Sequence, residues 1–433
     1  MNILMMTNTF TPHVGGVARS VSFFTHELRA MGHRVVVVAP EFEDMPEQEE
    51  DVIRVPAIQN FNGSDFSVII PVPGYLEAKL EEDFQPDVVH SHHPFLLGST
   101  ALRVASQYQI PLVFTHHTMY EQYTHYVPGD SQRMKVFAVK QATGYCNLCD
   151  AVVAPSESVA AILRERGVTV PIQSIPTGVY IEEFQRGDGL RLRRQFGLAP
   201  EDRVIGHLGR LAPEKNLPFL ARAVSQYLAT TDRGHFLVVG GGPSVDEIQA
   251  IFDDAGLGDR LHLTGSLSGQ DLVDAYHAMD VFTFASKSET QGMVLVEALA
   301  AGVPVVALDA NGAREVVRDG CNGRLLPHEE EAPFAAALAD VVDQLERDPE
   351  PLRRGALATA REFAMPRCAE RLQALYLQVQ RISEFHHMAD HSIWRAALEE
   401  LKAEWDILAN LTEAAVAALE EEVEPEEDAG AST

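Results

Sequence analysis

The chain alternates short apolar runs with helical patterns, and it does so in two separate series. The first series contains the runs MNILMMT, RVVVVAP and PLVFTHH, and the second contains RVIGHLGRL, HFLVVGGGP and VPVVAL. Apolar runs of this length, each followed by a segment of helical periodicity, are typical of parallel strands whose sheet is covered by helices on both faces. The sequence therefore predicts two Rossmann-like, doubly wound parallel-sheet domains.

A break between the two series marks the expected domain boundary. Pro176 and Gly178 interrupt regular structure there, so we predict a first domain at residues 1–178 and a second at 179–364. The helical pattern resumes at 365–382, which predicts a helix that crosses back over the first domain. The predicted fold class is α/β, with two parallel-sheet domains and a C-terminal helical part.

The last segment, residues 383–433, is predicted to be an acidic helical extension. Its apolar residues recur at spacings of three, four and seven, which suits either a coiled coil that forms a homo-oligomer or a helix docked on its own domain. From residue 420 the chain is mostly acidic and is expected to be disordered. The apolar positions are Trp394, Leu398, Leu401, Trp405, Leu408, Ala415 and Leu419.

Composition narrows the class of protein. The net charge of −29 argues against nucleic acid as a partner. The start of the chain lacks a basic region and a long apolar stretch, and no segment approaches the ~20 apolar residues that span a bilayer. We therefore expect a cytoplasmic protein, which can still touch the inner face of the membrane. Cys146 and Cys149 form a lone CxxC with no second pair for zinc, and we expect two half-buried helix cysteines.

Two glutamates stand out in SETQGMVLVEALAAGVPVVA, residues 288–307. Glu289 and Glu297 lie on either side of Gly292, in a loop and helix that follow a predicted strand. Ligands of open α/β sheets bind beyond the carboxyl ends of strands, and the helix starting near Met293 offers N–H groups to a phosphate. Carboxylates accept hydrogen bonds from vicinal hydroxyls, so the spacing suits a nucleotide sugar. Taken alone, it also fits two solvated helix glutamates.

Two further stretches point to an anionic ligand. Arg210 and Lys215, in GRLAPEKN, follow a predicted strand of the second domain, where two cations suit a diphosphate leaving group. Gly15 and Gly16 follow the first strand and open a helix, which makes a second glycine-lined anion site. Both stretches are expected to face the same cleft.

Another stretch, THHTMYEQYTHY at 115–126, follows the strand PLVF. Three tyrosines, three histidines and a glutamate in twelve residues make a polar, aromatic wall that suits a carbohydrate or polyol acceptor. A metal cluster is the rival interpretation, which we disfavour because cations of the second domain already serve the phosphates. A following helical pattern carries Arg133, Lys135 and Lys140, which predicts either a weak membrane contact or a solvated helix face.

These motifs, in this order, resemble the retaining glycosyltransferases of family 4, over about residues 1–380. The resemblance implies the GT-B fold, with two domains facing a cleft, and a nucleotide sugar as co-substrate without a cofactor or protein-bound metal. It implies that Glu289 holds the donor sugar, Glu297 the ribose, and Arg210 and Lys215 the departing diphosphate. Relatives often carry Asp where this chain has Tyr180. The expected donor-binding residues are Gly15, Gly16, Gly209, Gly241, Gly292, Met293, Val294 and Glu297.

Within that family, THHTMYEQYTHY and HSHHPFLLG resemble bacterial diacylglycerol glucosyltransferases. The resemblance implies transfer of glucose to diacylglycerol in glycolipid synthesis, with His117 near the reacting centre. A soluble sugar or a polyprenyl-linked acceptor is the alternative. A sugar-nucleotide epimerase would not need the tyrosine-rich wall, and a non-catalytic scaffold would not need the charged motifs. The expected acceptor-binding residues are His92, Tyr120, Glu121, Tyr123, His125 and Tyr126; the catalytic ones are His117, Glu289, Arg210 and Lys215.

Overall fold

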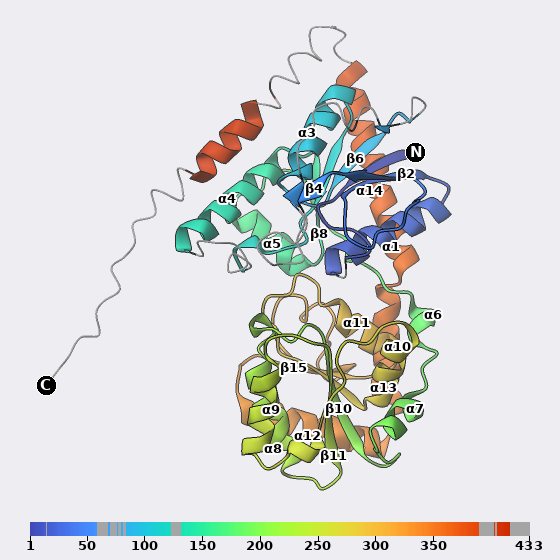
Figure 1. Cartoon of the computed structure of the whole chain (residues 1–433), viewed down its shortest axis with the longest axis vertical. Coiled ribbons are helices and arrows are strands. Elements are labelled where there is room, and N and C mark those ends of the chain that lie inside the picture. The colour runs from blue at the N-terminus through green and yellow to red at the C-terminus, as the bar shows by residue number, and fades with distance from the viewer. Residues whose placement is uncertain are drawn as a thin grey trace, which may run out of the picture.

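The computed structural model of the chain describes residues 1–13, 15–58, 68–69, 76, 79–80, 84–122, 131–388, 402 and 405–415. Two domains, each built on a parallel sheet, are stacked along the long axis of the molecule (Figure 1). This arrangement confirms the predicted fold class of two Rossmann-like domains with further helices at the C-terminal end. Among the described residues, none of the helices has the length and apolar character needed to cross a membrane.

The first domain contains a seven-stranded parallel sheet in the order β3-β2-β1-β6-β7-β8-β9, and β4 and β5 form a separate antiparallel pair. The chain order reverses between β1 and β6, which is where the carboxyl edge of such a sheet opens a ligand crevice. The strands are β1 (Asn2–Met6), β2 (Arg34–Pro40), β3 (Val52–Val55), β4 (Ala57–Ile58), β5 (Val68–Ile69), β6 (Val88–Ser91), β7 (Leu112–Thr115), β8 (Ala151–Ala154) and β9 (Ile172–Ser174). The helices are α1 (Gly16–Ala30), α3 (Leu97–Tyr108), the short η2 (Tyr120–Gln122), α4 (Gln132–Asn147) and α5 (Glu157–Glu165).

The second domain contains a six-stranded parallel sheet in the order β12-β11-β10-β13-β14-β15. Here the order reverses between β10 and β13, so the loops after these two strands meet at the carboxyl edge. The strands are β10 (Arg203–Leu208), β11 (Gly234–Val239), β12 (Leu261–Leu263), β13 (Val281–Phe284), β14 (Val305–Leu308) and β15 (Gly323–Leu326). The helices are α6 (Ile181–Phe184), α7 (Gly189–Gln195), η4 (Pro213–Lys215), α8 (Leu217–Leu228), α9 (Val245–Asp254), η5 (Gly258–Arg260), α10 (Gly269–Ala278), α11 (Met293–Ala300), α12 (Glu331–Arg347) and α13 (Glu350–Glu362).

The continuous apolar strands follow from burial on both faces of each sheet. In β1, Ile3 and Met5 belong to one core cluster, while Leu4 and Met6 belong to another. Successive side chains of a strand point to opposite faces, so a strand covered on both sides must be apolar at every position. This is why the strands show runs rather than alternation.

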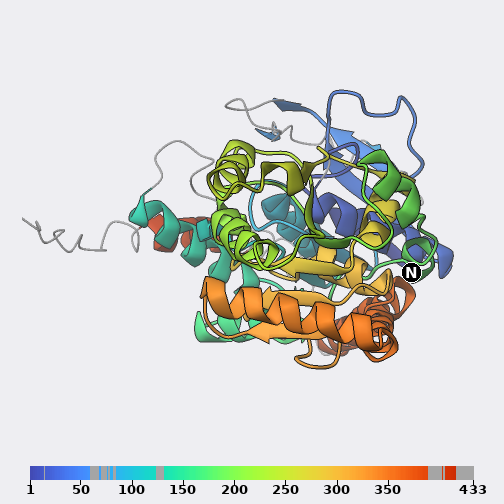
Figure 2. The same ribbon diagram turned by 90° about the horizontal axis from the view of Figure 1, so that it is seen from below.

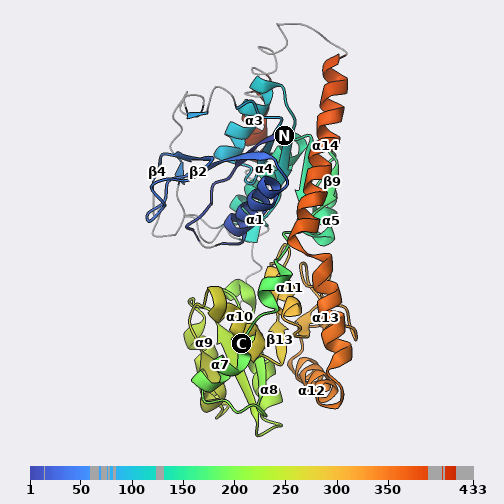
Figure 3. The same cartoon turned by 90° about the vertical axis from the view of Figure 1, so that its right-hand side faces the viewer.

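Helix α14 (Met365–Met388) ties the two domains together. It begins beside the second domain and runs along the first (Figure 3), where Leu372 and Tyr376 join the core cluster of Ile3. At its start the two crossing segments hydrogen-bond to each other, with the Val179 N–H donating to the Phe363 carbonyl at 2.9 Å and the Met365 N–H to the Val179 carbonyl at 3.0 Å.

That pairing explains the glycine in the linker. A Cβ on Gly178 would lie 2.4 Å from the Cα of Met365, so no larger residue fits without separating the two segments. The glycine that the sequence marks as a break in regular structure therefore allows a close approach between backbones.

The described part of the C-terminal extension docks on its own domain. In the helix 405–415, the Asn410 side chain donates to the Gln141 carbonyl of α4 at 3.1 Å, and Ile407 packs against the first-domain core. Both segments lie on the same side of the molecule (Figure 2). The other apolar positions of the extension up to Leu401, together with residues from 416 onward, lie outside the described residues.

The cysteine expectation needs a correction. Both Cys146 and Cys149 are free thiols. They are buried, whereas the sequence predicts that they are half-buried. Burial raises the pKa of Cys146 to about 12, so this thiol stays protonated and unreactive near neutral pH.

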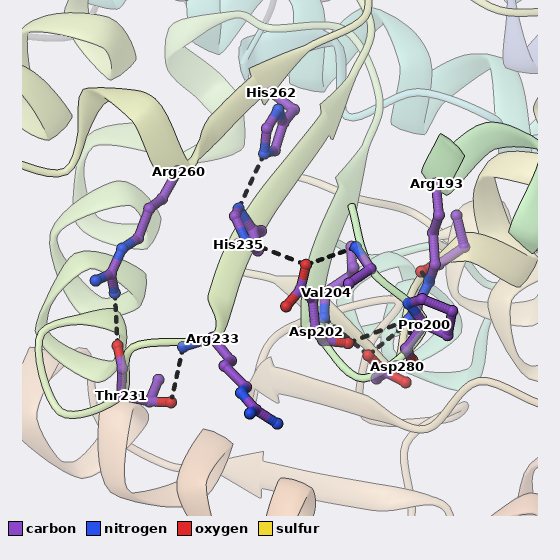
Figure 4. Close-up of polar contacts among 12 residues, drawn as sticks. Arg193, Pro200, Asp202, Val204, Thr231, Arg233, His235, Arg260, His262 and Asp280 are labelled. Carbon is purple, nitrogen blue, oxygen red and sulfur yellow. Dashed lines mark hydrogen bonds and ion pairs between the residues drawn. The ribbon is translucent and has the colours of Figure 1, made fainter. Parts of the chain in front are cut away.

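The amino-terminal edge of the second sheet is held by buried polar contacts (Figure 4). Asp280, just before β13, accepts a hydrogen bond from the Val204 N–H at 2.8 Å and pairs with the buried Arg193 of α7 at 2.8 Å. Along the same edge, the rings of His235 and His262 hydrogen-bond at 3.1 Å. This edge lies opposite the carboxyl ends of the strands, and its contacts hold α7 against the sheet.

Replacing Asp280 with Ala should therefore lower the free energy of unfolding by about 3 kcal/mol, because the buried Arg193 guanidinium would lose its counter-charge. Urea denaturation measures the change. Asp232→Ala is the matched control, since Asp232 is exposed and lies 3.9 Å from its arginine partner. Equal effects of the two substitutions would contradict this account.

Candidate active site

Glu289 and Lys215 meet because their loops follow neighbouring strands. Lys215 lies in η4 after β10, Glu289 lies in the loop after β13, and the two form an ion pair. Arg210, from the same loop as Lys215, is exposed and pairs with Glu214 at 2.5 Å. The structure therefore brings together one of the two predicted cations and the first of the two predicted glutamates.

Glycines set the path of the loops after β10 and β11. Gly240 has φ +134°, and a Cβ there would lie 1.9 Å from the Gly209 carbonyl oxygen. The Leu211 N–H donates to the Gly241 carbonyl at 2.9 Å, so the two loops pack backbone against backbone. A side chain at Gly240 would push the loop after β11 away from the loop after β10, which carries Arg210 and Lys215.

The start of α11 can hold an anion. Gly292 precedes it with φ +71°, and no side chain caps the first N–H groups of the helix. These amides, which include those of Met293 and Val294, are the groups that bind phosphate at helix N-termini. The predicted donor-binding residues Gly292, Met293 and Val294 thus lie together at the carboxyl edge of the second sheet.

Glu297, one turn into α11, is buried and has a partner from each domain. The Tyr276 hydroxyl of α10 donates to it at 2.7 Å, and a guanidinium nitrogen of Arg19 lies 2.5 Å from its other oxygen. Burial and the neighbouring carboxylate raise the pKa of Tyr276 well above its ordinary value. Because Arg19 lies in the first turn of α1, the contact places that helix start, with Gly16, close to Glu297.

A second set of contacts fixes the same loop to the linker. The Gln291 side chain accepts from the Thr177 N–H at 2.7 Å and donates to the Thr177 carbonyl at 2.5 Å. The Thr177 hydroxyl in turn lies 2.7 Å from that of Ser20 in α1. The sequence reasoning assigned no role to Gln291, Thr177 or Arg19; the position of Arg19 in the first turn after Gly15-Gly16 was the available signal.

The histidine loops of the first domain face this loop. The Thr290 hydroxyl donates to the His117 carbonyl at 2.8 Å. His117 Nε2 lies 2.9 Å from His92 Nδ1, with the rings stacked, because β6 and β7 are neighbours and both loops leave the same edge. His90 hydrogen-bonds Tyr376 of α14 at 2.6 Å beneath them.

Burial keeps this histidine pair uncharged. The pKa of His117 and of His92 is lowered well below the ordinary value by burial and by neighbouring histidines. At neutral pH one ring must donate its N–H to the other ring. Among the described residues, no group of three or more His, Cys, Asp or Glu side chains is arranged to hold a metal ion.

The predicted acceptor wall is only partly within the described residues. Tyr120 is half-buried, and its ring packs edge-on against His116 and Phe95. Glu121 pairs with Arg166, which follows α5, at 2.6 Å. Tyr123, His125 and Tyr126 lie outside the described residues.

Tyr180, where relatives often carry Asp, points towards the first domain. Its ring packs edge-on against Phe23 at 5.0 Å and His26 at 6.2 Å, both in α1. An aromatic contact between the linker and α1 thus occupies this position.

The sequence was compared with known protein families. It matches the description Glycosyltransferase Family 4 over residues 14–183 and Glycosyl transferases group 1 over residues 190–361. It is 30% identical to the alpha-monoglucosyldiacylglycerol synthase of Streptococcus pneumoniae over 314 residues, which are 71% of each chain. The chain belongs to glycosyltransferase family 4.

Other relatives of this family 4 glycosyltransferase carry different names. It is 29% identical to the GDP-mannose-dependent alpha-mannosyltransferase of Corynebacterium glutamicum over 337 residues, 75% of this chain and 76% of that one. The crystal structure of Anabaena HepE in complex with UDP superposes with a TM-score of 0.69 at 21% identity, covering 87% of this chain and all of the other. That likeness concerns the fold, which is GT-B as predicted.

The buried histidines of this glycosyltransferase predict acid sensitivity. Burial lowers the pKa of His90 and His93 to about 3 and that of His116 to about 4. Because the unfolded chain takes up protons near pH 6.5 and the folded chain does not, the free energy of unfolding should fall as pH drops from 6.5 towards 4. Each such group contributes up to about 1.4 kcal/mol per pH unit.

Urea midpoints measured between pH 7.5 and 5 test this prediction. His93→Asn should make the pH dependence shallower by about one histidine's share, and the Asn oxygen can still accept from the Asn8 N–H as His93 Nδ1 does. The same substitution at the exposed His328 is the control. A slope that His93→Asn leaves unchanged would show that another group causes the acid sensitivity.

Proposed function

We propose that the chain is a retaining hexosyltransferase that moves glucose from a nucleotide diphosphate sugar, UDP-glucose, to the free hydroxyl of diacylglycerol. The observation that carries the donor part is the meeting of Lys215 and Glu289 at the carboxyl edge of the second sheet. The two residues after Glu289 fix the same loop. Gln291 hydrogen-bonds the linker, and Thr290 hydrogen-bonds the His117 loop.

The charges suit a sugar linked to a diphosphate. Glu289 would accept hydrogen bonds from the hexose hydroxyls and Glu297 from the ribose. Lys215, Arg210 and the first amides of α11 would neutralise the diphosphate as it leaves, the role that a metal ion plays in other enzymes. The proposal therefore includes no protein-bound metal and no cofactor.

The reaction follows from that placement. The bond from the anomeric carbon to the diphosphate oxygen breaks, and a bond from the same carbon to the acceptor oxygen forms on the same face. The proton of the acceptor hydroxyl passes to the departing phosphate oxygen. The uncharged His117 would position the hexose by hydrogen bonds, since burial of the ring opposes its protonation.

The acceptor assignment rests on the relative named as a monoglucosyldiacylglycerol synthase and on the motifs around His92 and His117. The mannosyltransferase relative, at similar identity, makes GDP-mannose the second candidate donor. A soluble sugar or a polyprenyl-linked acceptor is the alternative to diacylglycerol. Both candidates use the same donor loop.

A donor and acceptor screen separates the two candidates. Purified protein is mixed with UDP-, GDP- and ADP-sugars, with and without dioctanoylglycerol in detergent micelles, and nucleotide release is followed. Release from UDP-glucose that rises with diacylglycerol is the expected result. Release that ignores the lipid but responds to a soluble sugar would replace the acceptor, and no release from any donor would remove the proposal.

Glu289→Gln should lower the rate of transfer by about two to three orders of magnitude, because the amide keeps one acceptor oxygen, replaces the other with an NH2 group that only donates, and loses the negative charge. Glu331→Gln is the matched control, since Glu331 also pairs with a cation, Arg222, at 2.5 Å on the surface of the same domain. Circular dichroism checks that both variants fold. A Glu289→Gln enzyme with ordinary activity would exclude the role given to this carboxylate.

A further inference from the structure

Half of the large exposed apolar side chains among the described residues lie on segments that contact one helix, α4. Of the ten such side chains in the described part of the chain, five lie on these segments. Two come from the loop before α3, and three come from the helix 405–415. The five are Phe95, Leu96, Trp405, Leu408 and Leu411.

Hydrogen bonds fix both segments to α4. The Gln141 side chain donates to the Pro94 carbonyl at 2.7 Å, and the Tyr145 hydroxyl donates to the Gly98 carbonyl at 2.9 Å. The Gln141 carbonyl accepts from Asn410 at 3.1 Å. The Phe95–Leu96 loop and the helix 405–415 are therefore both held against α4.

The loop that presents Phe95 and Leu96 is held in an unusual conformation. Leu96 has φ +57° and ψ −107°, a region that residues other than glycine rarely adopt. Asn8 holds it there, since its side chain donates to the Phe95 carbonyl at 3.1 Å and accepts from the Leu97 N–H at 3.2 Å. Strain that is maintained in this way, with two apolar side chains left in solvent, points to a functional surface.

The helix 405–415 exposes a stripe on the side away from α4. Trp405 and Leu408, three positions apart, are 70% and 58% exposed, while Ile407 and Ala414 turn inward. Asp406 and Glu413 are seven positions apart and form a separate stripe. The acidic residues of this helix thus do not interrupt its apolar face.

The charge of α4 differs from that of the chain as a whole. Residues 131–147 contain Arg133, Lys135 and Lys140 and no acidic residue, in a chain with a net charge of −29. Two copies of this chain, each with a net charge of −29, repel each other as wholes, which disfavours a second copy as the occupant of this surface. Exposed Trp and Leu beside cations suit the interface of an anionic lipid bilayer.

We propose that α4, the Phe95–Leu96 loop and the helix 405–415 form the face that contacts an anionic bilayer. The Trp405 and Leu408 side chains enter the interface, and Arg133 and Lys140, which are seven positions apart on one face of α4, meet lipid headgroups. This face adjoins the acceptor side of the site, because η2 packs against α4 and Phe95 contacts Tyr120. The inference deepens the proposed function and rests on it only for the identity of the lipid acceptor.

Vesicle flotation tests the surface without any substrate. Full-length protein is mixed with phosphatidylcholine vesicles that contain about 30 mol% phosphatidylglycerol, which gives the bilayer a negative surface potential that attracts basic segments. The wild-type chain should float with the vesicles, and the double variant Trp405→Ser, Leu408→Ser should bind about tenfold less. Its matched control is Leu377→Ser, Ile382→Ser on α14, where both side chains are also exposed. Helix α14 lies on a different side of the first domain from α4 (Figures 1 and 3).

Tryptophan emission gives a second measurement, which reports the surroundings of Trp405 in a chain that keeps this residue. The chain has two tryptophans, so a Trp394→Phe background leaves Trp405 as the reporter. Its emission should shift to shorter wavelength when vesicles are added, and the shift should weaken when Arg133 and Lys140 are both replaced by Gln. An emission spectrum that vesicles leave unchanged would overturn the inference.

Three outcomes separate the surface from the proposed function. If the wild-type chain releases nucleotide with soluble dihexanoylglycerol but does not bind vesicles, the proposed function is supported and the membrane surface is excluded. If the chain binds vesicles but releases no nucleotide, the membrane surface is supported and the proposed function is excluded. Light scattering covers the third case: a dimer that the Trp405→Ser, Leu408→Ser change converts to a monomer, without vesicle binding, would assign this face to a second copy.

Discussion

The geometry of the site depends on one amide. Gln291 hydrogen-bonds both backbone groups of Thr177, and because the contact is buried, water cannot take its place at low cost. Thr177 belongs to the linker and also touches α1 through Ser20. The loop that carries Glu289 is thereby set at a fixed distance from the first domain, and the start of α11 follows from it.

Charge balance is the second constraint on this site. Glu289 is paired with Lys215, and the buried Glu297 is paired with Arg19. A buried carboxylate without a partner is costly, so the buried Glu297 depends most on its cation. A donor must therefore replace existing ion pairs with its own hydroxyls and phosphates, and it gains net affinity only from the difference between the two sets of contacts.

The sequence predicts the fold well because its strands are buried on both faces. Apolar runs such as RVVVVAP cannot be stable in contact with solvent and must be buried. The alternation of these runs with helical patterns is compatible with only a few sheet topologies. The site is predicted in part, since GRLAPEKN and SETQGMVLVE each follow a strand and parallel strands end at a common edge. Contacts between domains are not predictable in this way. The pairing of Arg19 with Glu297 joins positions 278 apart, and no local pattern records it.

The roles of neighbouring groups also depend on packing that the sequence does not display. The motifs HSHHPFLLG and THHTMYEQ predict histidines in a cleft. The stacking of His92 on His117 and their uncharged state depend on the pairing of β6 with β7 and on burial, which the motifs do not show. Glu121 looks like a free carboxylate in sequence, and in the structure it pairs with Arg166, 45 positions away.

The path of α14 bears on how the chain is made. The core of the first domain includes Leu372, Tyr376 and Val379, which are among the last described residues of the main body to leave the ribosome. Strands β1 to β9 are therefore synthesised long before one face of their sheet can be covered. During that interval the second domain can fold as a unit, while the first waits with apolar surface exposed. A chain that stops before Met365 would keep every residue named here in the donor site and yet lack the helix that completes its other half.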